Sequence, residues 1–187
     1  ANLYGAKVLC IDLDLQGNLT KGCFKINPND KAIMLDIIKD EVPIEQAIIN
    51  VVPGLDLLPS SLDNGVLDNT LTLGRFPLDR VYREKLDKIK SNYDIILIDC
   101  PPALTASVTA ATLASDLVIS PVTPDEHSFS GLNLLYHEIQ DIEKKYRTSI
   151  PLKIVFNKFD TRNNLSHDKL NQIKNSSLFT QYLYQSY

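Results

Sequence analysis

Nearly continuous apolar runs, rather than alternating ones, mark the predicted strands of this chain. Four runs are rich in Leu, Ile and Val and are expected to be strands buried on both faces: 7–12, 94–100, 117–122 and 152–157. Parallel strands covered by helices have this pattern. A fifth run, 55–58, is bounded by Pro-Gly and Pro-Ser-Ser, and 182–187 is a sixth candidate.

Helical spacing of apolar residues fills the intervals between these runs. The pattern predicts helices at 30–39, 43–50, 78–90, 130–146 and 166–175, with Pro43 in a first turn and Ser166 as an N-cap. A further Ala-rich helix contains Ser107 but no GxSxG motif, so a serine hydrolase is not indicated. Alternating strands and helices predict one α/β domain over 1–187, a doubly wound, mainly parallel sheet flanked by helices.

Composition narrows the class of protein. With 44% hydrophobic and 22% charged residues in 187, the chain resembles an ordinary globular protein. A net charge of −4 argues against a generally basic nucleic-acid surface, although a local basic patch is compatible with it. No run reaches the roughly 20 apolar residues that span a bilayer, and no signal peptide is evident, so we expect a cytoplasmic protein. Cys10, Cys23 and Cys100 are widely spaced, and we expect small buried thiols in a reducing compartment.

Carboxylates follow two of the predicted strands. Asp12 and Asp14 come at and just after the end of the first strand, and Asp99 ends another. The carboxyl edge of a parallel sheet is where α/β proteins bind ligands. Asp99 could hold Mg²⁺ directly or through water, while Asp12 and Asp14 could bind metal-bound water or orient an attacking water. Turn capping by these acids explains the same spacing equally well.

Three further features bear on function. Asn157 begins an N-K-x-D sequence after another strand, and its amide could pair with a purine edge, although a four-residue match is short. The segment 121–131 is a possible partner-facing loop, in which His127 is expected to lie on the surface. No phosphate-binding GxxxxGK[ST] motif occurs in the 187 residues.

Together, these motifs resemble the ParA/Soj partition ATPases, which are related to MinD among the deviant Walker P-loop ATPases. The resemblance rests on K-V-L-x-I-D-L-D-x-Q-G-N-L-T at 7–20, Y-D-x-I-L-I-D-x-P-P at 93–102, and the segments 121–131 and 157–166. It implies that Asp14 positions the hydrolytic water, and that Asp12 and Gln16 lie near the nucleotide and its magnesium ion. It further implies that Asp99 is the Walker B aspartate holding Mg²⁺ and that Asn157 contacts adenine.

The resemblance also implies a biological role. Family members dimerise with ATP and Mg²⁺, bind DNA non-specifically, and hydrolyse ATP when stimulated by a ParB-type partner during plasmid or chromosome partition. The segment 121–131 would lie near the dimer interface, and no membrane is involved. The sequence departs from the family in having Leu15 in place of proline. The Lys-Gly-Gly-x-Gly-Lys-Thr loop expected upstream of Asn2, and the C-terminal part, are also missing.

Three alternatives remain open beside a fragment of an active ATPase. The first is a paralogue without a P-loop that acts as an interaction or regulatory module. The second is a MinD-like positioning ATPase, which would need a C-terminal basic amphipathic helix. The third is a metabolic member of the broader class, although the Gln16-Gly17-Asn18 match favours partition.

Overall fold

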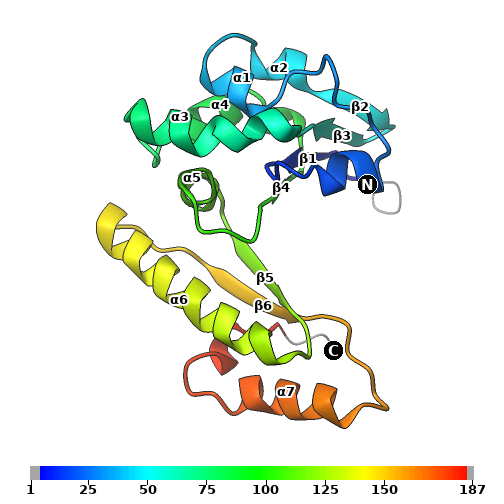
Figure 1. The fold of residues 1–187 in the computed structure, drawn as a ribbon, viewed down its shortest axis with the longest axis vertical. Helices are drawn as coiled ribbons and strands as arrows, with labels where there is room; N and C mark the ends of the chain where they lie inside the picture. The colour runs from blue at the N-terminus through cyan, green and yellow to red at the C-terminus, as the bar shows by residue number, and fades with distance from the viewer. Residues whose placement is uncertain (1–4, 185–187) are drawn as a thin grey trace. The chain divides into compact units, whose positions relative to one another are not determined.

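The computed structural model describes residues 5–184, except for the side chains at 126–128. The chain divides into two compact units, Ala1–Ala114 and Ser115–Tyr187 (Figure 1). We describe each unit by itself. The single domain expected over 1–187 stays a prediction.

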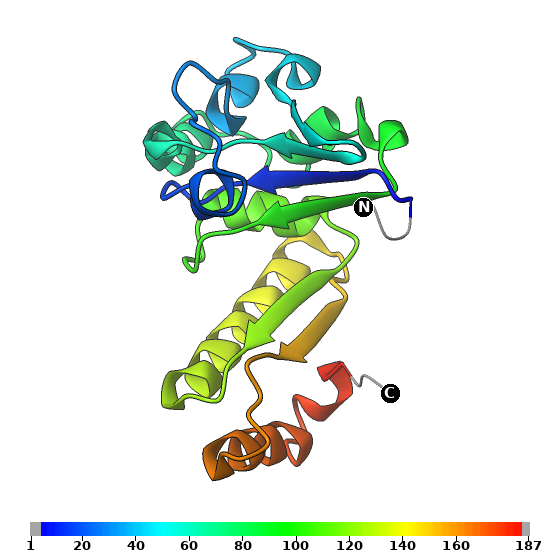
Figure 2. The same ribbon diagram turned by 90° about the vertical axis from the view of Figure 1, so that its right-hand side faces the viewer.

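The first unit is built on a four-stranded sheet in the order β2-β3-β1-β4. The three strands β1 (Val8–Asp12), β3 (Leu55–Leu58) and β4 (Ile95–Asp99) are parallel, and β2 (Ile49–Val52) runs antiparallel to β3. In Figure 2 the arrows of β1 (blue) and β4 (green) lie side by side and point the same way. This parallel pairing brings the ends of two acid-tipped strands to one edge of the sheet.

One face of this sheet carries most of the unit's core. Leu9 and Ile11 of β1 pack there with Ile37, Leu71 and Tyr82, all of which are buried. The opposite face has a smaller cluster formed by Val8, Cys10 and Leu57. The helices of this unit are η1 (a π-helix, Asn18–Cys23), α1 (Met34–Ile38), α2 (Ile44–Ala47), η2 (Leu62–Val66), α3 (Leu67–Leu73), α4 (Val81–Leu86), η3 (Lys90–Asn92) and α5 (Ala106–Ala114).

The second unit contains a parallel pair of strands. These are β5 (Val118–Val122) and β6 (Leu152–Phe156), joined by the long helix α6 (Glu126–Tyr146). They are followed by α7 (Asn164–Lys174) and η4 (Thr180–Tyr182). Leu132, Ile154 and Phe179 form the centre of this unit's core, and Phe129 meets Phe179 edge to face.

The main strands confirm the sequence prediction to within one residue at each end, but several other elements differ. The helix expected over 43–50 ends at Ala47, Pro43 is its N-cap, and the unpredicted strand β2 follows. Asn163, not Ser166, caps α7, because its side chain accepts a hydrogen bond from Leu165 N. The strand expected at 182–187 is absent from residues 182–184: Tyr182 ends η4 and Leu183 makes only an isolated bridge to Ile154, while 185–187 lie outside the described residues.

The expected burial of all four main strands on both faces is also wrong. β1 is buried throughout, whereas Ile95 and Leu97 of β4 are 48% and 51% exposed, and Ile119 of β5 is exposed as well. In the part of the chain that the structure describes, β4 is the last strand of its sheet and has only β1 as a neighbour. Its alternate residues Ile96 and Ile98 pack against the core on the other face. Within residues 5–184, no helix combines the length and apolar character that crossing a membrane requires.

Candidate functional site at the carboxyl edge of β1 and β4

The last residues of β1 and β4 bring two carboxylates side by side. Asp12 and Asp99 are paired in the strand register, and Leu13 N donates to Asp99 O at 2.9 Å, which extends the ladder beyond β1. Asp14 follows in the turn after β1. The structure therefore brings Asp12, Asp14 and Asp99 to the same edge of one sheet.

Asp12 is completely buried and acts as an internal hydrogen-bond acceptor. Its Oδ2 accepts from Thr20 N at 2.9 Å and from Thr20 Oγ1 at 2.7 Å, and its Oδ1 accepts from Asp14 N at 3.1 Å. Hydrogen bonds to an ionised group are strong enough to offset much of its burial penalty. Through its hydrogen bonds with Thr20, Asp12 connects η1 to the end of β1.

Asp14 is half-buried and keeps part of its carboxylate available. Its Oδ1 accepts from the backbone N of the exposed Gln16 at 3.0 Å, and within residues 5–184 its Oδ2 has no hydrogen-bond partner. Its main-chain oxygen accepts from Ser60 Oγ at 2.6 Å and from Gly17 N at 2.9 Å. The backbone of Asp14 is therefore held on two sides while its side chain can reach a ligand.

Gly17 makes this turn possible. Its φ of 62° lies in the left-handed region that L side chains rarely adopt. A Cβ added there would lie 2.8 Å from Lys21 Cε and 3.2 Å from Ser60 O. The glycine of the Gln-Gly-Asn sequence is thus favoured mainly by its backbone conformation, and crowding against Ser60 O adds to this preference.

Asp99 sits at the exposed end of β4, close to the other two acids. Partial burial of its carboxyl group, followed by the negative charges of Asp12 and then Asp14, raises its pKa above the ordinary value of 3.8. A cation at this edge would relieve that repulsion. Of the three thiols expected to be buried, Cys10 is buried, whereas Cys23 and Cys100 are exposed. Desolvation of the Cys100 sulfur, followed by the charge of Asp99, raises the pKa of this thiol to about 11, so little of it is thiolate at neutral pH.

The carboxylates at this edge fit a Mg²⁺ ion that is also bound by waters and phosphate oxygens. Among residues 5–184, no three His, Cys, Asp or Glu side chains are grouped closely enough to hold a metal ion by themselves. Magnesium commonly binds through one or two carboxylates together with waters and phosphate oxygens. Asp99 matches that pattern, and Asp14 beside it keeps one oxygen available, whereas Asp12 has its oxygens engaged within the protein.

Asn157 lies at the end of β6 in the second unit. Its backbone N donates to Val122 O at 2.8 Å, and its Oδ1 accepts from Lys158 N at 2.9 Å. Lys158 has a positive φ of 54°, so the Asn157 side chain supports a strained turn. The segment expected to be a loop over 121–131 is largely helical, because α6 begins at Glu126; His127 is in this helix, and its side chain lies outside the described residues.

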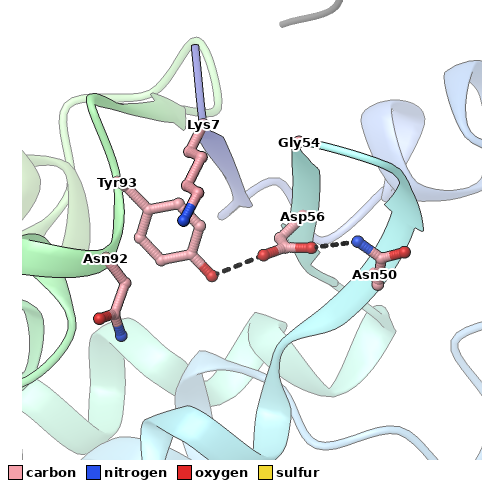
Figure 3. A pocket seen from close by; sticks show the side chains of 6 residues that line it. All are labelled: Lys7, Asn50, Gly54, Asp56, Asn92 and Tyr93. Atoms are coloured by element: carbon pink, nitrogen blue, oxygen red, sulfur yellow. Dashed lines mark hydrogen bonds between the residues drawn. The ribbon is translucent and has the colours of Figure 1, made fainter. Parts of the chain in front are cut away.

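A polar pocket of about 340 Å³ lies at the opposite, amino edge of the first sheet (Figure 3). Tyr93 OH donates to Asp56 Oδ2 at 2.8 Å, and Asn50 Nδ2 donates to Asp56 Oδ1 at 2.7 Å. These bonds tie the start of β4 to β3 and β2, and burial together with Asp56 raises the pKa of Tyr93 to about 12. The pocket is lined by Lys7, Asn50, Gly54, Asp56, Asn92 and Tyr93. It contains none of the predicted site residues, and the hydrogen bonds among its lining residues indicate a structural role in connecting the strands.

Sequence reasoning missed the residues that support the acids. Thr20, Ser60 and Asn64 are all buried polar residues linked by hydrogen bonds to Asp12 or Asp14. Thr20 ends the motif at 7–20, but Ser60 and Asn64 follow β3 and carry no motif signal.

Comparisons with known proteins agree with this architecture. Residues 2–154 match the family described as AAA domain. The chain is 30% identical over 176 residues to a ParA family protein of Chlamydia trachomatis, covering 92% of this chain and 68% of that protein. It belongs to the ParA/Soj family. Soj, the sporulation initiation inhibitor protein of Bacillus subtilis, is 28% identical over 174 residues, covering 91% of this chain and 68% of Soj.

A solved relative confirms the fold class. A plasmid partition protein of Borrelia burgdorferi, determined with bound AMPPNP, superposes with a TM-score of 0.78 at 27% identity, covering 98% of this chain and 75% of that one. The chain is thus an α/β protein of the P-loop NTPase type, with a mainly parallel sheet flanked by helices. It spans about two thirds of the length of the two curated relatives.

Proposed function

We propose that the complete gene product is a ParA-type ATPase that serves in DNA partition or intracellular positioning. The observation that carries this proposal is the Asp12–Asp99 register pair with Asp14 directly beyond it. Family relatives named for chromosome partition, and an AMPPNP-bound plasmid partition protein of the same fold, support it.

The three acids would have different tasks in ATP hydrolysis. Asp14, with one carboxylate oxygen available, would accept a hydrogen bond from the water that attacks the γ-phosphate in line. Asp99 would hold Mg²⁺ through water or directly, and Asp12 would keep the turn in place. When bound, Mg²⁺ neutralises charge on the phosphate oxygens. Gln16 would lie beside the nucleotide, and Asn157 would contact adenine.

A phosphate-binding loop from outside these 187 residues would complete the site. We propose that the strand leading to it pairs with the outer edge of β4, because β4 is the last strand of its sheet and its outward N–H and C=O groups are available for pairing. Ile95 N and Asp99 O bond toward β1, so the amides of Ile96 and Ile98 face outward. Hydrogen exchange should find these two amides protected in the complete gene product, and fast exchange there would contradict this placement.

The partners follow from the same proposal. ATP would drive homodimerisation, the dimer would bind DNA non-specifically, and a ParB-type protein would stimulate hydrolysis in the cytoplasm. Either plasmid or chromosome partition is compatible with the relatives.

The decisive experiment separates nucleotide binding from turnover. With Mg²⁺, Asp14→Ala in the complete gene product should abolish ATP hydrolysis while leaving the Kd for ATP within about threefold. Asp79→Ala, which removes an exposed acid elsewhere in the first unit, is the matched control and should leave both unchanged. Normal hydrolysis by the Asp14 variant would refute the role assigned to this residue.

A second candidate is a non-catalytic interaction module. One observation favours it: the carboxylate of Asp12 is engaged internally. If the complete gene product binds neither ATP nor ADP in the presence of Mg²⁺, this candidate replaces the ATPase.

A further inference from the structure

Ser60 links the loop after β3 to both acids at the end of β1. It is completely buried, and its backbone N donates to Thr20 Oγ1 at 3.0 Å. Thr20 Oγ1 in turn donates to Asp12 Oδ2 at 2.7 Å. Ser60 Oγ donates to the main-chain oxygen of Asp14 at 2.6 Å. One serine therefore reaches Asp12 through Thr20 and Asp14 directly.

Asn64 sets the direction of the Ser60 hydroxyl. Its Nδ2 donates to Ser60 Oγ at 2.8 Å, and the residue is only 4% exposed. Because Ser60 Oγ accepts this bond, its single proton is directed toward Asp14 O. The second amide atom, Asn64 Oδ1, is buried without a hydrogen-bond partner within the described residues, and burying a polar atom in this way costs free energy.

We infer that Ser60, oriented by Asn64, is a positioning residue that sets the main chain of Asp14 for hydrolysis. This inference rests on the proposed ATPase function. Ser60 approaches the main chain of Asp14 and leaves the carboxylate untouched. The loop after β3 thus fixes where the Asp14 carboxylate points without competing for it.

Kinetics with three variants test this inference in the complete gene product. Ser60→Ala removes the donor to Asp14, and Asn64→Asp replaces the amide donor by an acceptor, which turns the Ser60 proton away from Asp14 at nearly constant volume. Misplacement of a catalytic group by about 1 Å can lower turnover about 100-fold. We expect kcat to fall about 10-fold or more in both variants, with the KM and Kd for ATP within about threefold. Ser61→Ala is the matched control, because Ser61 Oγ accepts only the capping bond from Asp63 N, and its kcat should be unchanged.

A double variant separates positioning from folding. Ser60→Ala/Asn64→Leu removes both polar partners, so it should recover stability relative to Ser60→Ala, because no buried amide lacks a partner. If the inference is correct, kcat stays low in the double variant. A kcat that recovers together with the stability would show that Ser60 is merely structural.

A nucleotide-free measurement keeps this inference distinct from the proposed function. Gly17 N bonds to Asp14 O and Thr20 N bonds to Asp12. Hydrogen exchange at these two amides should be at least 10-fold faster in Ser60→Ala than in Ser61→Ala. Unchanged exchange would overturn the inference even in an active ATPase. Faster exchange in a protein that does not bind ATP would instead overturn the proposed function, and with it the role of Ser60 in hydrolysis, while the structural link to Asp14 stands.

Discussion

Thr20→Val is the sharpest test of the hydrogen bonds that support the acid edge, by which we mean Asp12, Asp14 and Asp99 at the carboxyl ends of β1 and β4. Valine has nearly the shape of threonine, so the substitution removes the hydroxyl without opening a cavity. Thr20 Oγ1 makes two buried hydrogen bonds, one to Asp12 Oδ2 at 2.7 Å and one from Ser60 N at 3.0 Å. Both would be lost at a residue with no exposed surface.

The expected loss follows from these two bonds. A hydrogen bond to a charged group contributes about 1.5–3 kcal/mol, and a buried N–H left without a partner costs about 1–3 kcal/mol. Asp12 Oδ2 keeps the bond from Thr20 N, so the lower part of the combined range applies. We expect the free energy of unfolding to fall by about 3 kcal/mol. At about 2–4 °C per kcal/mol for a protein of this size, Tm should fall by about 6–12 °C.

Urea unfolding followed by far-UV circular dichroism measures this loss, and an unchanged m value would show that the extent of unfolding is the same. Thr72→Val is the matched control, because Thr72 is an exposed residue of α3. The reasoning is refuted if the unfolding free energies of the Thr20 and Thr72 variants agree to within about 0.5 kcal/mol.

Three further predictions concern single residues. Gly17→Ala should destabilise the protein by about 1–3 kcal/mol in urea unfolding, because its φ is left-handed and a Cβ would crowd Ser60 O; Gly22→Ala, with open space around the added Cβ, should not. The pKa of Asp99 is raised on folding, so its ionisation opposes folding and stability falls as pH rises from about 3.8 through the folded-state pKa. Asp99→Asn should therefore be more stable than the parent at pH 7 without Mg²⁺, and equal stability in thermal melts would contradict this. The pKa of Tyr93 is about 12 in the folded state against 10 in the unfolded chain, so stability should fall between pH 10 and 12, and Tyr93→Phe should lessen that fall in pH-dependent unfolding.

The positions of the strands could be predicted because each apolar run is a local feature of the sequence. Runs such as 8–11 are apolar throughout, and neither an amphipathic helix nor a half-exposed strand requires that pattern. β2 was missed although a signal was present. Val52 pairs with Leu55 across Pro53 and Gly54, and Gly54 has a φ of 79°. Pro followed by Gly favours a type II turn, so this dipeptide indicates a hairpin rather than the end of a helix.

The exposure of β4 could not be predicted from its composition. A continuous apolar run shows that a strand is suited to burial, but not whether a neighbour covers it. Among residues 5–184, β4 pairs only with β1, and Ile95 and Leu97 remain accessible. Coverage depends on elements elsewhere in the fold, which the run itself does not specify.

At the acid edge, the positions of the three acids could be predicted from the sequence, but their hydrogen-bond partners could not. The spacing of Asp12, Asp14 and Asp99 relative to the strand ends predicted their common edge, because register follows from parallel pairing. Their hydrogen bonds could not be predicted, since Ser60 lies 40 residues from Thr20 in the sequence. The π-helical turn at 18–23, which brings Thr20 back to Asp12, likewise has no motif of its own.

Burial and available lone pairs assign different roles to Asp12 and Asp14, which the sequence presents as equivalent members of one Asp-Leu-Asp triplet. Asp12 is inaccessible and accepts three hydrogen bonds, so any ligand would have to displace donors already in place. Asp14 accepts one bond at its carboxylate, and its backbone is fixed by Ser60 and Gly17. A carboxylate that orients water needs a fixed backbone and a free oxygen, and Asp14 has both. The turn after β1 therefore holds a buried hydrogen-bond acceptor and, two residues later, a carboxylate with an available oxygen, which supports the catalytic role that we propose for Asp14. The loop after β3 stabilises this arrangement through Ser60.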